Sequence, residues 1–212
     1  MTLLQSVPVE GRVVLEDVSW EFYERMLAEI GDGHTRLTFD CGRLEIMSPS
    51  GMHERVKTIL GRLIETYGDA LDLAVEGGGS TTFKRKDLRK GLEPDECYWV
   101  ANAPRMMGKT KINLKSDPPP DLVIEVDVSR PLVSRQPIYA AMGVPEVWTY
   151  ARSRVTPMHL RRGTYHAADR SLAFPDLPMD VVNQMVRIAM SEGQSAATKA
   201  FRAWIKSSQR ER

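Results

Sequence analysis

Two acidic segments carry the residues best suited to chemistry. The first is Pro94-Asp95-Glu96, and the second runs from Asp121 through Glu125 to Asp127. Side chains alternate along a strand, so Asp121, Val123, Glu125 and Asp127 share one face, and the opposite face is apolar. A carboxylate in such an apolar strand is costly to bury unless it is paired or binds a metal. If the segment at Asp95 forms a neighbouring strand, four carboxylates converge.

Convergent carboxylates predict a site for a divalent cation. Hard oxygen ligands of this kind suit Mg²⁺ or Mn²⁺. Such a cation orients a phosphodiester, lowers the pKa of an attacking water and stabilises the departing oxygen. The alternative interpretation is that the acids form salt bridges or lie on a solvated face of the sheet, because a single acidic strand is a common surface pattern.

His53 is a further candidate for the site. It lies near the start of an expected helix, three residues before Val56 on the same apolar face. Its side chain could form a hydrogen bond with a metal-bound water or a phosphate. A lone histidine on an apolar helix face is more often a packing residue whose hydrogen bonds are satisfied, and this alternative stays open.

Basic side chains that could contact the phosphates of DNA are Lys84, Lys86, Arg89 and Lys90. Further basic side chains lie between residues 109 and 115 and at Arg161-Arg162. The formal net charge is only +1, and most duplex-binding proteins are more basic. Ordinary surface charge is therefore the alternative for all of these segments. We find no recognition-helix or zinc-finger pattern that would read bases.

Five stretches of the chain carry a family resemblance. They are LEIMSPSGMHERV (44–56), GGGSTTFKR (77–85), LEPDECYWV (92–100), PPDLVIEVDVS (119–129) and IYAAMGVPEVWTY (138–150). In this order they resemble the Uma-two-type restriction endonuclease family of the PD-(D/E)xK nuclease superfamily. A single PD dipeptide would be a weak signal, whereas the set together is specific. The resemblance covers roughly residues 35–177.

The resemblance implies a sheet flanked by helices and a metal site with two carboxylates. Asp95 takes the place of the PD aspartate, and Glu125 is the acid of the second motif. The backbone carbonyl of Val126 is an additional candidate ligand. Asp121 and Asp127 would assist from outside the set of direct ligands.

One departure from the superfamily pattern concerns its lysine. The position two residues after Glu125 holds Asp127. Many family members supply the lysine from the following helix, and counting back from Tyr139 places Arg135 there. Arginine can hold a phosphate or stabilise negative charge, but it stays protonated and does not act as a base. Lys84 and Lys86 are other candidates, and a solvated basic side chain is the alternative for all three.

The elements that must position these residues alternate between helices and strands. Apolar periodicity predicts helices over 15–30, from 51 to about 67, over 131–142 with a start or kink near Pro137, over 181–190 and over 194–205. Strands are expected over 35–39 and 43–47 as a hairpin, and over 71–75, 81–84, 96–100, 121–128, 146–150, 158–162 and 163–167. Residues 84–91 are expected to form a polar turn, 101–115 to be irregular and 206–212 to fray.

This order predicts an α/β (α+β) fold with a restriction-endonuclease-like mixed sheet flanked by helices. We expect an N-terminal helical segment (1–34), a nuclease-like core (35–178) and a C-terminal helical extension (179–212). An apolar stripe with Phe201 and Trp204 in the last helix would pack on the domain or on a second subunit, so a homodimer or higher homo-oligomer is expected.

Composition narrows the functional classes. With 212 residues, 42% hydrophobic and 27% charged, the chain has ordinary globular composition and no apolar run that could span a bilayer. The N-terminus shows no secretory signal, so a cytoplasmic location without membrane partners is expected. Cys41 and Cys97 form no CxxC pair, which argues against a thiolate zinc site.

The leading hypothesis is therefore a Mg²⁺- or Mn²⁺-dependent endonuclease that hydrolyses DNA phosphodiester bonds. The alternative is a catalytically inactive nuclease-fold protein that binds nucleic acid or a protein partner. A third hypothesis is an oligomeric accessory protein. A serine hydrolase is disfavoured because the chain lacks a Gly-x-Ser-x-Gly elbow. A phosphate loop ending at Gly108-Lys109-Thr110 fails because Ala103 stands where the first glycine is needed.

Overall fold

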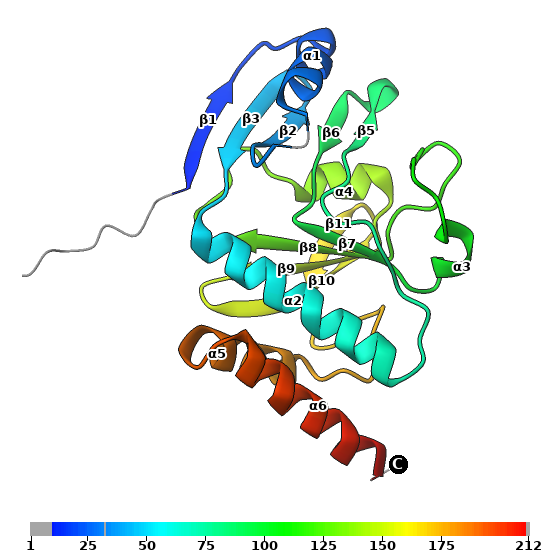
Figure 1. The fold of residues 1–212 in the computed structure, drawn as a ribbon. Helices are drawn as coiled ribbons and strands as arrows, with labels where there is room; N and C mark the ends of the chain where they lie inside the picture. The colour runs from blue at the N-terminus through cyan, green and yellow to red at the C-terminus, as the bar shows by residue number, and fades with distance from the viewer. Residues whose placement is uncertain (1–9, 32, 211–212) are drawn as a thin grey trace, which may run out of the picture.

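The computed structural model describes residues 10–31 and 33–210, whose strands form two sheets (Figure 1). The first sheet is antiparallel with five strands in the order β1-β3-β2-β6-β5. Its strands are β1 (Gly11–Leu15), β2 (Arg36–Asp40), β3 (Arg43–Ser48), β5 (Phe83–Arg85) and β6 (Lys90–Leu92), with a 3₁₀ turn η1 (Lys86–Leu88) between the last two. Helix α1 (Trp20–Ile30) packs against this sheet through Trp20 and Tyr23.

The second sheet has six strands in the order β11-β10-β9-β8-β7-β4. These are β4 (Glu76–Gly77), β7 (Glu96–Trp99), β8 (Leu122–Asp127), β9 (Glu146–Ala151), β10 (Arg154–Arg161) and β11 (Thr164–Ala167). Strands β8 and β9 are parallel and are connected through α4 (Gln136–Met142), whereas the other pairs are antiparallel. The predicted mixed sheet is thus confirmed, but the predicted hairpin belongs to a separate sheet.

Strand β8 separates two apolar layers, as its alternation predicts. Leu122, Ile124 and Val126 pack with α2 (Gly51–Ala70), α5 (Met179–Ser191) and α6 (Gln194–Arg210). Val123 packs on the opposite side with α4. Figure 1 shows α2 crossing the six-stranded sheet with α6 beyond it. Glu125 therefore points from β8 toward the α4 side.

Helix α2 begins where the sequence predicts, because the Ser50 hydroxyl caps it by accepting a hydrogen bond of 3.2 Å from the His53 amide. Its apolar face is buried. The helix can approach the sheet closely at Gly61, where a Cβ atom would lie 2.9 Å from the Tyr98 hydroxyl. This start and this close approach fix His53 in the first turn, beside the sheet.

Several predicted elements differ in detail. The helix expected from residue 15 begins at Trp20, since 11–15 form β1 and Ser19 caps α1. Residues 71–75 form no strand, part of the expected polar turn at 84–91 pairs as β5 and β6, and α3 (Ala103–Met106) lies in the segment expected to be irregular. The last helix continues to Arg210 because Phe201 and Ile205 pack into the core, while 211–212 lie outside the described residues.

None of the helices within residues 10–31 and 33–210 combines the length and apolarity needed to cross a membrane.

Candidate functional site

Strand pairing brings Asp95 and Glu125 together. Glu96 on β7 pairs with Ile124 on β8, so Asp95, one residue earlier, lies beside Glu125. Both side chains are buried, with exposed fractions of 1% and 4%. The Val126 amide donates a hydrogen bond of 2.7 Å to Asp95 Oδ2, which ties the two strands together at this point.

Helix α4 places two partners on Glu125. Arg135 precedes the first turn of α4 and Tyr139 follows it by four residues, a spacing that puts both on one face. The Arg135 Nη1 group donates to Glu125 Oε2, and the Tyr139 hydroxyl donates to Glu125 Oε1. All three side chains are buried, so the pair is shielded from water. Each oxygen of Glu125 therefore has a partner.

The His53 ring bridges two carboxylates. Its Nδ1 lies 2.9 Å from Glu10 Oε1, and its Nε2 lies 2.9 Å from Asp95 Oδ1. The contact with Asp95 has ion-pair distance, but the two atoms are not aligned as a hydrogen bond. Burial disfavours the charged ring, yet Asp95 and Glu10 outweigh it and raise the pKa of His53 to about 9. His53 is therefore an imidazolium at neutral pH.

An ionic clasp joins the five-stranded sheet to the loop after β8. We define the clasp as Glu10, Arg12, Glu45 and the loop residues they bind. Arg12 contacts Glu10 Oε2 at 2.9 Å, Glu45 Oε1, and Ser129 Oγ at 2.9 Å. Glu45 Oε2 accepts from the amides of Leu132 at 2.5 Å and Val133 at 2.8 Å. The loop that leads to Arg135 is thus held by side chains far away in the sequence.

The carboxylates of the site have divergent pKa values. Burial alone would raise the pKa of Asp95, but His53, Arg135 and the Val126 amide lower it. Burial raises the pKa of Glu125 to about 8 against the opposing charge of Arg135, and Asp95 and Asp127 add to that rise. Burial also raises the pKa of Asp127. Asp95 therefore ionises more readily than an ordinary carboxyl group, whereas Glu125 and Asp127 keep their protons to higher pH.

The donor set fits a divalent cation in its chemistry. Five carboxyl groups (Glu10, Glu45, Asp95, Glu125 and Asp127) lie around the cations Arg12, Arg135 and His53, so the acidic groups outnumber the cations by two. Asp95 Oδ1 and Asp127 Oδ1 are buried and accept no hydrogen bond from the described residues. A cavity of about 240 Å³ is lined by Glu125, Asp127, Arg135 and Tyr139 among others. Within residues 10–31 and 33–210 no group of three or more such side chains is preformed in ligand geometry. A cation would also have to draw Glu125 away from Arg135 or Tyr139.

Some predicted site residues lie elsewhere. Asp121 does not face the carboxylates, because its oxygens accept from the amides of Val100 at 2.8 Å and Asn102 at 2.9 Å and from the Asn102 side chain. Through these bonds Asp121 stabilises the turn after β7, at the opposite end of β8 from Asp127. The role that we expected for Asp121 beside the metal is therefore corrected to a structural role.

The four cations predicted to contact DNA lie on the five-stranded sheet or its 3₁₀ turn. Lys84 pairs with Glu24 at 3.1 Å, and Lys86 pairs with Glu21 at 3.2 Å. Lys90 pairs with Asp40. Arg89 is exposed and takes a left-handed conformation that ends η1. Three of the four are therefore already matched with acids, and none lies in the cavity beside Glu125.

Sequence reasoning missed four residues of this region: Glu10, Arg12, Glu45 and Tyr139. Glu45 had a usable signal, since it stands between Leu44 and Ile46 in a strand just as Glu125 stands between Ile124 and Val126. Tyr139 had a weaker one, its spacing of four residues from Arg135. Glu10 and Arg12 had none, because their partners other than each other are 33 to 119 residues away.

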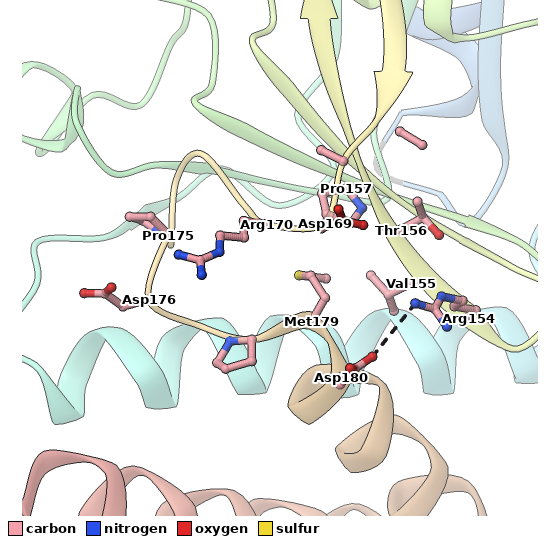
Figure 2. Close-up of a pocket in the computed structure, with 13 residues that line it drawn as sticks. Arg154, Val155, Thr156, Pro157, Asp169, Arg170, Pro175, Asp176, Met179 and Asp180 are labelled. Carbon is pink, nitrogen blue, oxygen red and sulfur yellow. Dashed lines mark ion pairs between the residues drawn. The ribbon is translucent and has the colours of Figure 1, made fainter. Parts of the chain in front are cut away.

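Other cavities lie apart from these carboxylates. One of about 650 Å³ lies between β10 and the start of α5, where Arg154 and Asp180 approach within 3.9 Å (Figure 2). Its lining mixes Asp169, Arg170 and Asp176 with apolar residues. None of the carboxylates discussed above lines it, so the buried carboxylates remain the candidate for chemistry.

Comparison with known proteins adds one match. The sequence model of a family described as "Putative restriction endonuclease" (Uma2) matches residues 20–190. The matched segment contains His53, Asp95, Glu125 and Arg135, whereas Glu10 and Arg12 precede it. No curated protein matches the chain.

Proposed function

The chain belongs to the Uma2 family of restriction-endonuclease-like proteins, and from this we propose that it is a metal-dependent endonuclease that hydrolyses DNA phosphodiester bonds. The observation that carries the proposal is that Asp95, one residue before β7, lies beside Glu125 on the adjacent strand β8, and that Arg135 is paired with Glu125. Paired buried acids next to a fixed cation and a small cavity suit the handling of a phosphate group.

Mg²⁺ or Mn²⁺ would be held by Asp95, Glu125 and the backbone carbonyl of Val126, and when bound it would supply an activated water and charge stabilisation. Asp127 lines the same cavity with an oxygen that accepts no hydrogen bond from the described residues. The raised pKa of Asp127 makes this oxygen a suitable acceptor for the proton of an attacking water.

The cations of the site have separate tasks in this proposal. Arg135 stays protonated, so it neutralises charge on the phosphate and does not move a proton. His53 is held between Glu10 and Asp95 and is charged at neutral pH, so it orients Asp95 and does not serve as a base.

The second candidate is an inactive nuclease-fold protein that binds DNA or a protein partner. Two observations favour it: Asp127 stands where the superfamily has lysine, and both oxygens of Glu125 already have partners in Arg135 and Tyr139. This candidate predicts retention of DNA without any metal-dependent turnover.

A cleavage assay separates the two candidates. Supercoiled, single-stranded and branched DNA are incubated with purified protein and Mn²⁺ or Mg²⁺. We expect cleavage by the wild type, and a loss of roughly 100- to 1000-fold in Asp95→Asn and Glu125→Gln, since ligand loss removes several kcal/mol of transition-state stabilisation. Asp121→Asn is the matched control: it changes a carboxylate just before the same strand but outside the site, and should retain activity within a few-fold.

Calorimetric titration with Mn²⁺ tests the metal directly. Binding to the wild type that disappears in Asp95→Asn and Glu125→Gln but not in Asp121→Asn supports the proposal. A wild type that cleaves none of the DNA forms with either metal contradicts it and favours the inactive protein.

A further inference from the structure

A groove lies between α2 and α6, and none of the carboxylates of the candidate site lines it. It is made by a hollow of about 750 Å³ and a second of about 320 Å³ that share the lining residues Thr66, Asp69, Arg202 and Lys206. Helices α2 and α6 lie side by side along it (Figure 1). We call this feature the α2–α6 groove.

Cations line both walls of the groove. Arg62 comes from α2, and Lys199, Arg202 and Lys206 come from α6. Their spacing of three and four residues keeps the α6 cations on one face, while Ala197, Phe201 and Ile205 are buried on the other. All four cations are exposed, and within residues 10–31 and 33–210 none of them forms an ion pair.

The arrangement contrasts with the basic segment at residues 84–90. Lys84, Lys86 and Lys90 each have a carboxylate partner. The groove also contains Glu65 and Asp69, but they leave its four cations in excess. In a chain whose formal net charge is only +1, this is a local concentration of unmatched positive charge.

The spacing suits a polyanion better than a single small anion. Lys199 and Lys206 are seven residues apart, which is about 10 Å along a helix. A nucleic-acid strand presents one phosphate per roughly 3.4 Å of duplex axis, so a length of about 10 Å along that axis corresponds to about three intervals between phosphates. Arg62 lies nine residues after His53, about 13 Å along α2, so the groove and the carboxylate site share one helix.

We infer that the α2–α6 groove binds the phosphate backbone of DNA. The inference rests on the proposed function for its choice of polyanion and goes beyond it in naming the surface, which differs from the basic segments at residues 84–90. Contacts to phosphates carry no base information, so binding here is independent of sequence and weakens as salt rises.

The test measures DNA binding without catalysis. A fluorescein-labelled 24-base-pair duplex is titrated in EDTA, and anisotropy is followed at several salt concentrations. The wild type is compared with Lys199→Ala/Arg202→Ala/Lys206→Ala and with the matched control Lys84→Ala/Lys86→Ala/Lys90→Ala. We expect the groove variant to bind at least about tenfold more weakly, with a salt slope smaller by about 2 to 3, and the control to bind within twofold of the wild type.

The outcomes separate this inference from the proposed function. A groove variant that is folded by circular dichroism but binds like the wild type overturns the inference, even if the wild type cleaves DNA. Loss of binding in the control variant alone, or no binding by the wild type, also overturns it. Groove-dependent binding by a wild type that never cleaves supports the inference and contradicts the nuclease proposal alone.

Discussion

At the scale of single residues, the site is a set of buried charged side chains that form ion pairs with one another. Glu10 and Asp95 flank His53, and Arg135 is paired with Glu125. Burying a charge is costly, so removal of one partner leaves the other in an unfavourable position. These side chains are therefore expected to tie the stability of the fold to the protonation of the site.

His53 gives this link a definite sign. Folding raises its pKa from the ordinary 6.5 to about 9, because the favourable charges of Asp95 and Glu10 outweigh its burial. The folded state therefore binds the proton more tightly, and the stabilisation is complete below pH 6.5 and lost as pH rises through about 9. A shift of this size corresponds to about 3 kcal/mol.

Urea unfolding in EDTA between pH 6 and 10 measures this effect. The free energy of unfolding of the wild type should fall across the window, because His53 and Glu125 both have raised pKa values in the folded state. In His53→Gln the fall should be smaller, and the part that remains should lie below about pH 8, where Glu125 loses its proton. An equal fall in both proteins would show that other groups govern stability in this range.

At the scale of elements, the position of Arg135 depends on two strands from the other sheet. Glu45 on β3 binds the amides of Leu132 and Val133, and Arg12 on β1 binds Ser129. These contacts span 87 to 117 residues of sequence. The clasp thus fixes the loop that leads into α4.

Glu45→Ala is expected to release this loop. It removes the only carboxylate that accepts from Leu132 and Val133 among the described residues, so amide hydrogen exchange at 130–135 should accelerate about tenfold or more. DNA cleavage should fall because Arg135 loses its fixed position. Glu16→Ala, which breaks an exposed pair with Arg43 at 3.1 Å, should change neither quantity. Unchanged exchange in Glu45→Ala would show that the clasp is dispensable.

At the scale of the whole molecule, the two sheets meet at the site and the last helix closes the core. Glu10, Arg12 and Glu45 come from the five-stranded sheet or the residue before it, and Asp95 and Glu125 come from the six-stranded sheet or the residue before β7 (Figure 1). Phe201 of α6 is fully buried and lies beside Tyr67 of α2. The division into segments 1–34, 35–178 and 179–212 and the homo-oligomer stay predictions.

Phe201→Ala tests whether α6 is part of the core. Truncating a fully buried phenylalanine should lower the free energy of unfolding by about 3–5 kcal/mol. The neighbouring Arg202→Ala is the control and should change it by less than about 0.5 kcal/mol, because that side chain is exposed. Equal free energies of unfolding in the two variants would show that α6 contributes little to the stability of the core.

The sequence predicts those features of the fold and the site that depend on local patterns of residues. The alternation around Glu125 gives the two faces of β8, and the helical spacing after Ser50 gives α2 and the place of His53. It could not predict β1, a five-residue edge strand joined to a helix by a short turn, nor the partners of Glu10 and Arg12. Those contacts arise only when two sheets pack, and no local periodicity records them.

The place of Glu10 has a practical meaning for anyone who shortens this protein. A fragment that starts at Trp20, where the family match begins, would lack both the carboxylate at His53 Nδ1 and the guanidinium between Glu10 and Glu45. His53 and Glu45 would remain buried without these charged partners. Assays on such a fragment would report on that damage, and its inactivity would say nothing about the longer chain.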